Sequence, residues 1–440
     1  MLKTFINAWK IPDLRKKMIF TIFIVFIFRL GCQIPVPFFS GENLFGTSTG
    51  SGTFFDFVSM LTGEAFNYGT LFALGITPYI NSSIILQLLA VAIPALEKLS
   101  HDEEGRKKMT KITRYVTVGL ALLQSVAYFI YIRSKDNFLI FKAEGFAGVM
   151  QGVFIVSVLT AGSVLVMWLG EQINDKGIGN GISIILFAGI VSRLPATLYG
   201  IIQPFWVNRS WYYLLSPLTL IFLILMIAYI VWMDGAERRI PVQYAKRVVG
   251  RKMYGGQSSN IPIKVNLSGV LPIIFASSIL SVPPTIKMFV ADKLEANPDS
   301  FWNTFFGWFD SGKVVYCVIY FLLIIFFAYF YASIQYNPVE MANNLAKNSG
   351  MIPGIRSGRP TADYIAKVIS KIVLLGALML SVVALFPNVF QIINNALGFD
   401  QLRSISIGGT SIIIVVGVAL ETVQQIESQM MMRHYKGFLD

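Results

Sequence analysis

The sequence predicts an all-α membrane protein that crosses the bilayer ten times. Of its 440 residues, 55% are hydrophobic and 14% are charged, with a mean hydropathy of +0.63, whereas a soluble domain carries about 25% charged residues. A spanning helix needs about 20 mainly apolar residues. The ten segments of this kind are 18–38, 71–93, 115–132, 149–170, 182–202, 213–233, 267–286, 314–335, 368–386 and 406–423.

The distribution of basic residues orients these spans. With the N-terminus inside, the cytoplasmic loops and the two termini hold 26 of the 36 Lys and Arg, and none lies between Leu30 and Glu97. Because cytoplasmic loops are enriched in Lys and Arg, we expect both termini in the cytoplasm. The run after the basic N-terminal arm is too long for a signal peptide and lacks a small-residue cleavage site, so we expect it to remain as the first span.

The first outer loop contains a segment that cannot cross the membrane. Residues 46–53 are rich in Gly, Ser and Thr, which is typical of a flexible tether. Residues 54–67 are half apolar but too short to span. Two interpretations fit them: an amphipathic helix at the membrane surface, or a short helix that re-enters the protein.

The second and seventh spans carry polar residues within apolar sequence. The second has Pro78, Asn81 and Gln87, and the seventh has a proline and the pair Ser277 and Ser278. Such side chains are costly against lipid and are tolerated where they face protein or water. We therefore expect both helices to line a polar or moving part of the molecule.

The sequence argues against an enzyme. Its two histidines, His101 and His434, lie in a charged loop and in the C-terminal tail, so a Ser–His or metal site at membrane depth lacks its histidine. The partial P-loop pattern at 307–313 is followed by Val314 where Ser or Thr is required. No nucleotide site and no cofactor are therefore expected.

Secondary transport is the main alternative class of function. Ion-coupled transporters usually hold carboxylates, lysines or histidines near the membrane midplane, and the central thirds of the ten spans contain none. Arg29 and Arg193 lie within the spans, but arginine stays protonated and cannot relay a proton. Snorkelling to the interface or helix pairing accounts for both.

Several motifs along nearly the whole chain resemble one family, in the order that the family has them. They are GITPYINSSIILQLL (75–89), WLGEQINDKGIGNGISIILFAGIV (168–191), RRIPVQYAKR (238–247), YGGQSSNIPIKVNLSGVLPIIFASSIL (254–280), NPVEMANNLAKNSGMIPGIRSGRPT (337–361) and GGTS (408–411). Together they resemble the SecY family, the channel-forming subunits of the Sec protein translocase.

The resemblance implies ten helices in two pseudo-symmetric halves, 1–202 and 203–440, around an hourglass-shaped pore, with a plug at about 53–67. The implied pore ring falls on Ile76, Ile80, Leu186, Ile274 and Ile414. The implied plug residues are Phe57, Val58, Met60, Leu61 and Phe66. A lateral gate is implied between the second and third helices and the seventh and eighth, at Asn81, Ser82, Ser83, Gln87, Ser277 and Ser278.

The resemblance also implies partners. The cytoplasmic loops 234–266 and 336–367 would contact the SecA ATPase and the ribosome through Arg238, Arg239, Lys246, Arg247, Arg251, Lys252, Arg356 and Arg359. Ordinary orientation charge on solvated loops explains most of the same residues. SecE and SecG subunits, signal sequences, nascent polypeptides and anionic lipids complete the expected partners.

We therefore expect a passive protein-conducting channel of the bacterial plasma membrane, with secondary transport as the alternative. Such a channel passes unfolded secretory proteins across the membrane and releases membrane-protein helices sideways. Its energy would come from SecA or from the ribosome, because the sequence offers no nucleotide site.

The topology can be tested by cysteine accessibility. Lys108→Cys, Arg247→Cys and Ser357→Cys lie in predicted cytoplasmic segments. Each cysteine should react with a membrane-impermeant thiol reagent in inverted vesicles and stay unlabelled in intact cells. Labelling of any of the three from outside intact cells contradicts the arrangement of ten spans with the N-terminus inside.

Overall fold

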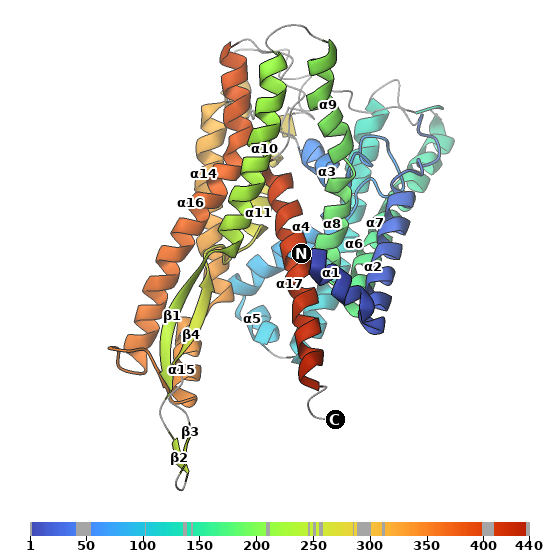
Figure 1. The fold of residues 1–440 in the computed structure, drawn as a ribbon. Helices are drawn as coiled ribbons and strands as arrows, with labels where there is room; N and C mark the ends of the chain where they lie inside the picture. The colour runs from blue at the N-terminus through green and yellow to red at the C-terminus, as the bar shows by residue number, and fades with distance from the viewer. Residues whose placement is uncertain are drawn as a thin grey trace.

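The computed structural model is an α-helical bundle with a small β-stranded projection at one end (Figure 1). It describes residues 2–40, 54–101, 103–134, 139–141, 144–207, 212–244, 247–249, 252–254, 258–284, 286–287, 301–309, 313–397 and 409–436.

Helices account for most of the described chain. Those of the first part are α1 (Leu2–Lys10), α2 (Pro12–Gly31), α3 (Phe54–Thr62), α4 (Thr77–Ala92), α5 (Pro94–His101), α6 (Glu103–Ser134), α7 (Gly145–Lys176), α8 (Gly181–Val191) and α9 (Leu194–Val207). The later ones are α10 (Tyr212–Gly235), α11 (Leu271–Leu280), α13 (Phe301–Gly307), α14 (Val314–Gln335), α15 (Pro338–Lys347), α16 (Arg359–Leu397) and α17 (Gly409–Lys436).

The prediction of a helical protein with many spans is confirmed. Within the described ranges, seven helices are long and apolar enough to cross a membrane, and two shorter apolar helices, Thr77–Ala92 and Leu271–Pro284, accompany them. Each of the ten predicted spans overlaps a helix. The first of these, α2, carries Arg15, Lys16, Lys17 and Arg29 along an otherwise apolar sequence.

Three predicted spans differ from the helices that form. The second span was expected from residue 71, but its helix starts at Thr77, because Gly75 takes a left-handed φ of +52° and Pro78 occupies the first turn. The seventh starts in the same way, with Gly269 at +60° before α11 and its first-turn proline. The fifth is divided into α8 and α9 by a break at residues 192–193.

Two hydrophobic clusters form the centre of the bundle. One joins α2, α4, α7 and α8 with Ile274 of α11 and with α17. The other joins α10, α11, α14, α16 and α17. Val270 and Ile84 pack against both clusters. Since apolar packing is the contact between them, the parts of the bundle meet along a surface without directional bonds.

Small residues let the helices approach closely. A Cβ at Gly162 of α7 would overlap the carbonyl of Leu71, and one at Gly181 of α8 would overlap the carbonyl of Gly170. Glycine at such points is typical of helix interfaces in membranes, where close backbone approach provides packing that lipid cannot.

The projection is a sheet assembled from two loops. Strands β1 (Glu237–Tyr244) and β4 (Ser258–Lys264) form an antiparallel hairpin, and β5 (Gly350–Met351) adds to β1 on its other edge, so the order is β4-β1-β5. At the tip, β2 (Arg247–Val249) pairs with β3 (Lys252–Tyr254). Because β5 belongs to the later loop, the two predicted cytoplasmic loops form one structural unit (Figure 1).

Candidate pore constriction, plug and docking loops

The five predicted ring residues lie together in one apolar cluster. They come from the start of α4 and from α8, α11 and α17, and each is at most 8% exposed. Ile76 and Ile80 are one helical turn apart and share a face of α4. An aliphatic ring offers no hydrogen bond to water or ions. The arrangement can therefore close a passage by excluding water, although its role as a pore ring stays a prediction.

Helix α3 packs on this cluster from within the bundle. Leu61 is buried and Met60 partly buried against the ring cluster, and the Met60 sulfur lies 3.8 Å from the Thr410 hydroxyl of α17. Val58 and Phe66 are 1% exposed and belong to a neighbouring cluster with Tyr128. The side chain of Phe57, the fifth predicted plug residue, lies outside the described part.

Residues 58–67 thus correspond to the re-entrant interpretation and not to a helix on the membrane surface. Figure 1 shows α3 toward the end of the bundle opposite to the β-strands. The polypeptide that follows α3 is anchored: the Tyr128 hydroxyl donates a 2.7 Å hydrogen bond to the Phe66 carbonyl. The backbone N–H groups of Leu71 and Val36 donate to Ile34 and Gly69.

The predicted gate residues do not all face one another. Ser82 is fully buried, and its hydroxyl lies 2.6 Å from the hydroxyl of Thr117 on α6. Ser277 donates to carbonyls of its own helix, and the Ser278 hydroxyl is buried with no partner among the described residues. The expected contact of Ser82 with Ser277 or Ser278 is therefore corrected, because α6 offers Ser82 a closer partner.

The other polar residues of α4 are less engaged. Gln87 is exposed and donates to the Ser83 hydroxyl at 3.3 Å. Asn81 is partly buried. The contact that α4 makes toward the second central cluster comes instead from Ile84, which is aliphatic. Polar residues mark this helix in the sequence, but apolar packing joins it to α11 and its neighbours.

The predicted docking cations lie on the projection and beside it. Arg238 and Arg239 are exposed on β1, and Arg239 forms an ion pair with Glu237 at 2.6 Å. Arg356 and Arg359 are exposed, and the Arg356 carbonyl accepts a 2.8 Å hydrogen bond from Thr361. Arg247 and Lys252 lie on β2 and β3, but their side chains lie outside the described part, as do Lys246 and Arg251 altogether.

Sequence reasoning missed one ion pair near α3. Glu64, just after the helix, lies 3.0 Å from Arg193 at the break between α8 and α9. The two residues are far apart in sequence, and Arg193 alone suggested only snorkelling or helix pairing. A carboxylate in a re-entrant segment together with a lone arginine in an apolar span was the available signal.

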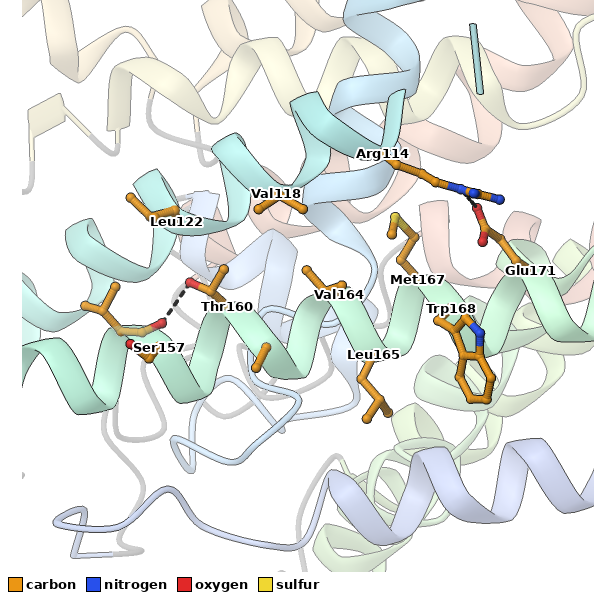
Figure 2. Close-up of a pocket in the computed structure, with 12 residues that line it drawn as sticks. Arg114, Val118, Leu122, Ser157, Thr160, Val164, Leu165, Met167, Trp168 and Glu171 are labelled. Carbon is orange, nitrogen blue, oxygen red and sulfur yellow. Dashed lines mark hydrogen bonds and ion pairs between the residues drawn. The ribbon is translucent and has the colours of Figure 1, made fainter. Parts of the chain in front are cut away.

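A groove of about 780 Å³ runs between α6 and α7, away from the ring (Figure 2). Its walls are mainly aliphatic, and at one end Arg114 and Glu171 form an ion pair at 2.8 Å beside the exposed Trp168. Among the described residues, no group of three or more His, Cys, Asp or Glu is arranged to hold a metal ion.

Comparisons with known proteins agree with the resemblance in the motifs. A family model described as SecY matches residues 70–423. A protein named Protein translocase subunit SecY from Streptomyces galbus is 43% identical over 452 residues, covering 100% of both chains. A solved structure described as a protein conducting channel matches with a TM-score of 0.59 at 17% identity, covering 94% of this chain and 92% of the other.

A second solved structure extends the similarity to a ribosome-bound protein. It is described as Sec61 in the canine ribosome-channel complex from the endoplasmic reticulum, and it matches with a TM-score of 0.56 at 16% identity. It covers 94% of this chain and 92% of its own. At this identity the similarity concerns the fold.

The ring assignment can be tested by making the cluster polar. Ile76→Ser together with Ile80→Ser should hydrate the constriction and raise the ion conductance of the resting protein in planar bilayers. Ile85→Ser is the matched control, because Ile85 lies on the same helix but is 40% exposed. If the double variant conducts no more than the parent, the five side chains are ordinary core packing.

Proposed function

The chain belongs to the SecY family, and from this premise we propose how its parts conduct a polypeptide. It is the channel-forming subunit of a protein translocase and not an enzyme. It passes unfolded secretory proteins across the membrane and releases membrane-protein helices sideways. The observation that carries the function is the 43% identity to a translocase subunit over the full length of both chains. A secondary transporter is not favoured.

The proposed architecture is ten spanning helices in two halves, 1–202 and 203–440. It is supported by a helix at every predicted span, with α8 and α9 together in the fifth. It is also supported by the similar beginnings of α4 and α11, each preceded by a left-handed glycine and opened by a first-turn proline. Such a repeat is expected of equivalent helices in two related halves.

The proposed seal has two layers. The aliphatic ring closes the passage by dewetting and offers a sliding chain no polar group to bind. Helix α3 is the plug, and its support is the packing of Met60 and Leu61 on the ring cluster. A translocating chain has to displace α3 and part the ring, and the loss of apolar contacts is regained when both close.

The proposed lateral gate lies between α4 with α6 on one side and α11 with α14 on the other. Ser82 supports this division because its bond to Thr117 holds α4 to α6, so these two helices form one wall. Across the gate, Ile84 packs without hydrogen bonds. Contacts between helices in lipid are weak, about 0.6 kcal/mol for a polar contact, so a hydrophobic signal sequence can part the walls.

The proposed docking surface is the projection formed by β1, β4, β5 and the loop of Arg356. Its cations suit phosphate groups of ribosomal RNA and acidic groups on ribosomal proteins near the exit of the nascent chain or on SecA. SecA or the ribosome supplies the energy, SecE and SecG are the proposed membrane partners, and anionic lipids surround the basic side. The proposed location is the bacterial plasma membrane with both termini in the cytoplasm.

The gate can be tested with two disulfides on one protein. Ser83→Cys paired with Ser278→Cys joins the two proposed walls, whereas Ser82→Cys paired with Thr117→Cys joins α4 to α6 within one wall. After oxidation, the first pair should stop translocation of a precursor and reduction should restore it. The second pair should leave translocation near the parent rate. Full activity of a channel that is completely cross-linked across the walls refutes sideways opening at this place.

Arg356 provides a separate test of motor coupling. Arg356→Glu should leave folding and insertion intact, because the side chain is exposed, but it should slow SecA-driven translocation into vesicles by about tenfold to a hundredfold, the loss expected for hydrogen bonds to a charged group. Arg356→Lys should restore part of the rate, since lysine keeps the charge without the planar fork. Lys347→Glu, another exposed cation near this loop, is the control, and equal rates for the two Glu variants would remove Arg356 from the coupling site.

A further inference from the structure

The turn after α3 has a backbone that its own residues do not favour. Gly63 has a φ of +65° and Glu64 a φ of +72°. Glycine adopts such values readily, but a residue with a side chain does so at a cost. A strained residue of this kind persists where its surroundings hold it. The contacts of Glu64 therefore decide whether the turn keeps its shape.

The contact that holds Glu64 is an ion pair with the fifth span. Its Oε1 lies 3.0 Å from Nη2 of Arg193, which sits at the break between α8 and α9. The backbone N–H of Glu64 also donates to the Ser59 carbonyl of α3 at 3.0 Å. One residue thus connects the last turns of α3 to the end of α8.

The backbone at this junction is packed too closely to shift by small steps. A Cβ at Gly63 would overlap the carbonyl of Gly189 and approach the hydroxyl of Ser192. A Cβ at Gly189 would in turn overlap the carbonyl of Leu61. Contact between atoms this close is either kept or lost, so the turn either fits against α8 or leaves it.

A second arginine makes the carboxylate more important. A Cβ at Gly63 would come within 3.0 Å of Nη1 of Arg29, and that nitrogen is buried with no hydrogen-bond partner among the described residues. Two guanidinium groups therefore flank one carboxylate. Without the carboxylate, the turn would bring two positive charges near each other where water is limited, and like charges repel.

The position of the turn gives the ion pair its mechanical meaning. The polypeptide after Glu64 is fixed to the bundle through Phe66 and Leu71, whereas α3 before it packs on the ring cluster by apolar contacts. Arg193 follows the helix that carries the ring residue Leu186. The ion pair thus lies where the proposed plug, its anchor and a ring helix meet.

We propose that the Glu64–Arg193 ion pair is a latch that positions α3 against the ring and biases the channel toward its closed state. Breaking the pair frees the strained turn, and α3 then leaves the ring cluster more readily. This inference rests on the proposed function of α3 as a plug. Glu64 and Arg193 are positioning residues, since neither needs to touch the translocating chain.

The test compares charge removal with charge exchange. Glu64→Gln and Arg193→Gln should each raise the open fraction of resting channels in planar bilayers by roughly 2- to 5-fold, the range expected for a partly exposed ion pair. Both should also improve export of a precursor with a weakened signal sequence. The double variant Glu64→Arg, Arg193→Glu restores an opposite-charge pair and should return both readouts toward the parent. Glu144→Gln and Arg133→Gln, at exposed positions next to the predicted outer loop between α6 and α7, are the matched controls.

Deletion of residues 57–66 separates this inference from the proposed function. If the deletion leaks ions but the two single variants behave like the parent, the latch is wrong and the plug remains. If the deletion itself does not leak, the plug assignment fails. If the single variants leak and exchange of the charges does not restore closure, local packing and not the ion pair holds the turn, and the latch is again overturned. Arg193→Lys, which keeps the charge, should stay close to the parent and identifies a variant that leaks only because the fold is disturbed.

Discussion

Aliphatic packing around Ile76, Leu186, Ile274 and Ile414 is the contact on which the rest of the structure depends, because it joins helices from both ends of the chain. Dispersion and apolar contact are individually weak and have no preferred direction. A core of this kind can therefore separate and re-form without leaving buried donors or acceptors unpaired. Hydrogen bonds at the same place would make each opening costly in a medium without water. The chemistry that keeps the centre closed is the chemistry that lets it open.

Polar interactions are found instead within parts that stay together. Ser82 bonds α6, Tyr128 bonds the segment after α3, and Ser163 of α7 donates to the Gly75 carbonyl beside the start of α4. These bonds fix the helices of the first half to one another. Directional bonds thus define rigid groups of helices, and apolar contacts define the surfaces between the groups. The Glu64–Arg193 pair differs because it joins α3, which is otherwise held to the ring by apolar contacts, to a fixed helix.

The sequence predicted the spans well and their local geometry poorly, for physical reasons. Hydropathy reports the transfer of a whole segment into lipid, so it located a helix at each of ten positions, but it is insensitive to the left-handed turn at Gly75 that delays α4 to Thr77. The five ring residues came from the resemblance, since a single buried isoleucine in a helix has no distinguishing signal. The partner of Ser82 depends on the rotation of α4 against α6, and the pairing of β1 with β5 depends on contacts more than a hundred residues apart. Neither is encoded in local periodicity.

The strand pairing of β1 with β5 has a consequence for how this molecule can vary. Gln243 and Tyr244 are bonded in register with Met351 and Gly350, and Leu345 and Ile352 share a core with Ile240 and Val242. The two loops are therefore one inherited module: an insertion or a graft in either one alters the register and the core of the other. Chimaeras with a relative should exchange both loops together, and compensating changes over evolutionary time should appear as pairs across this strand edge.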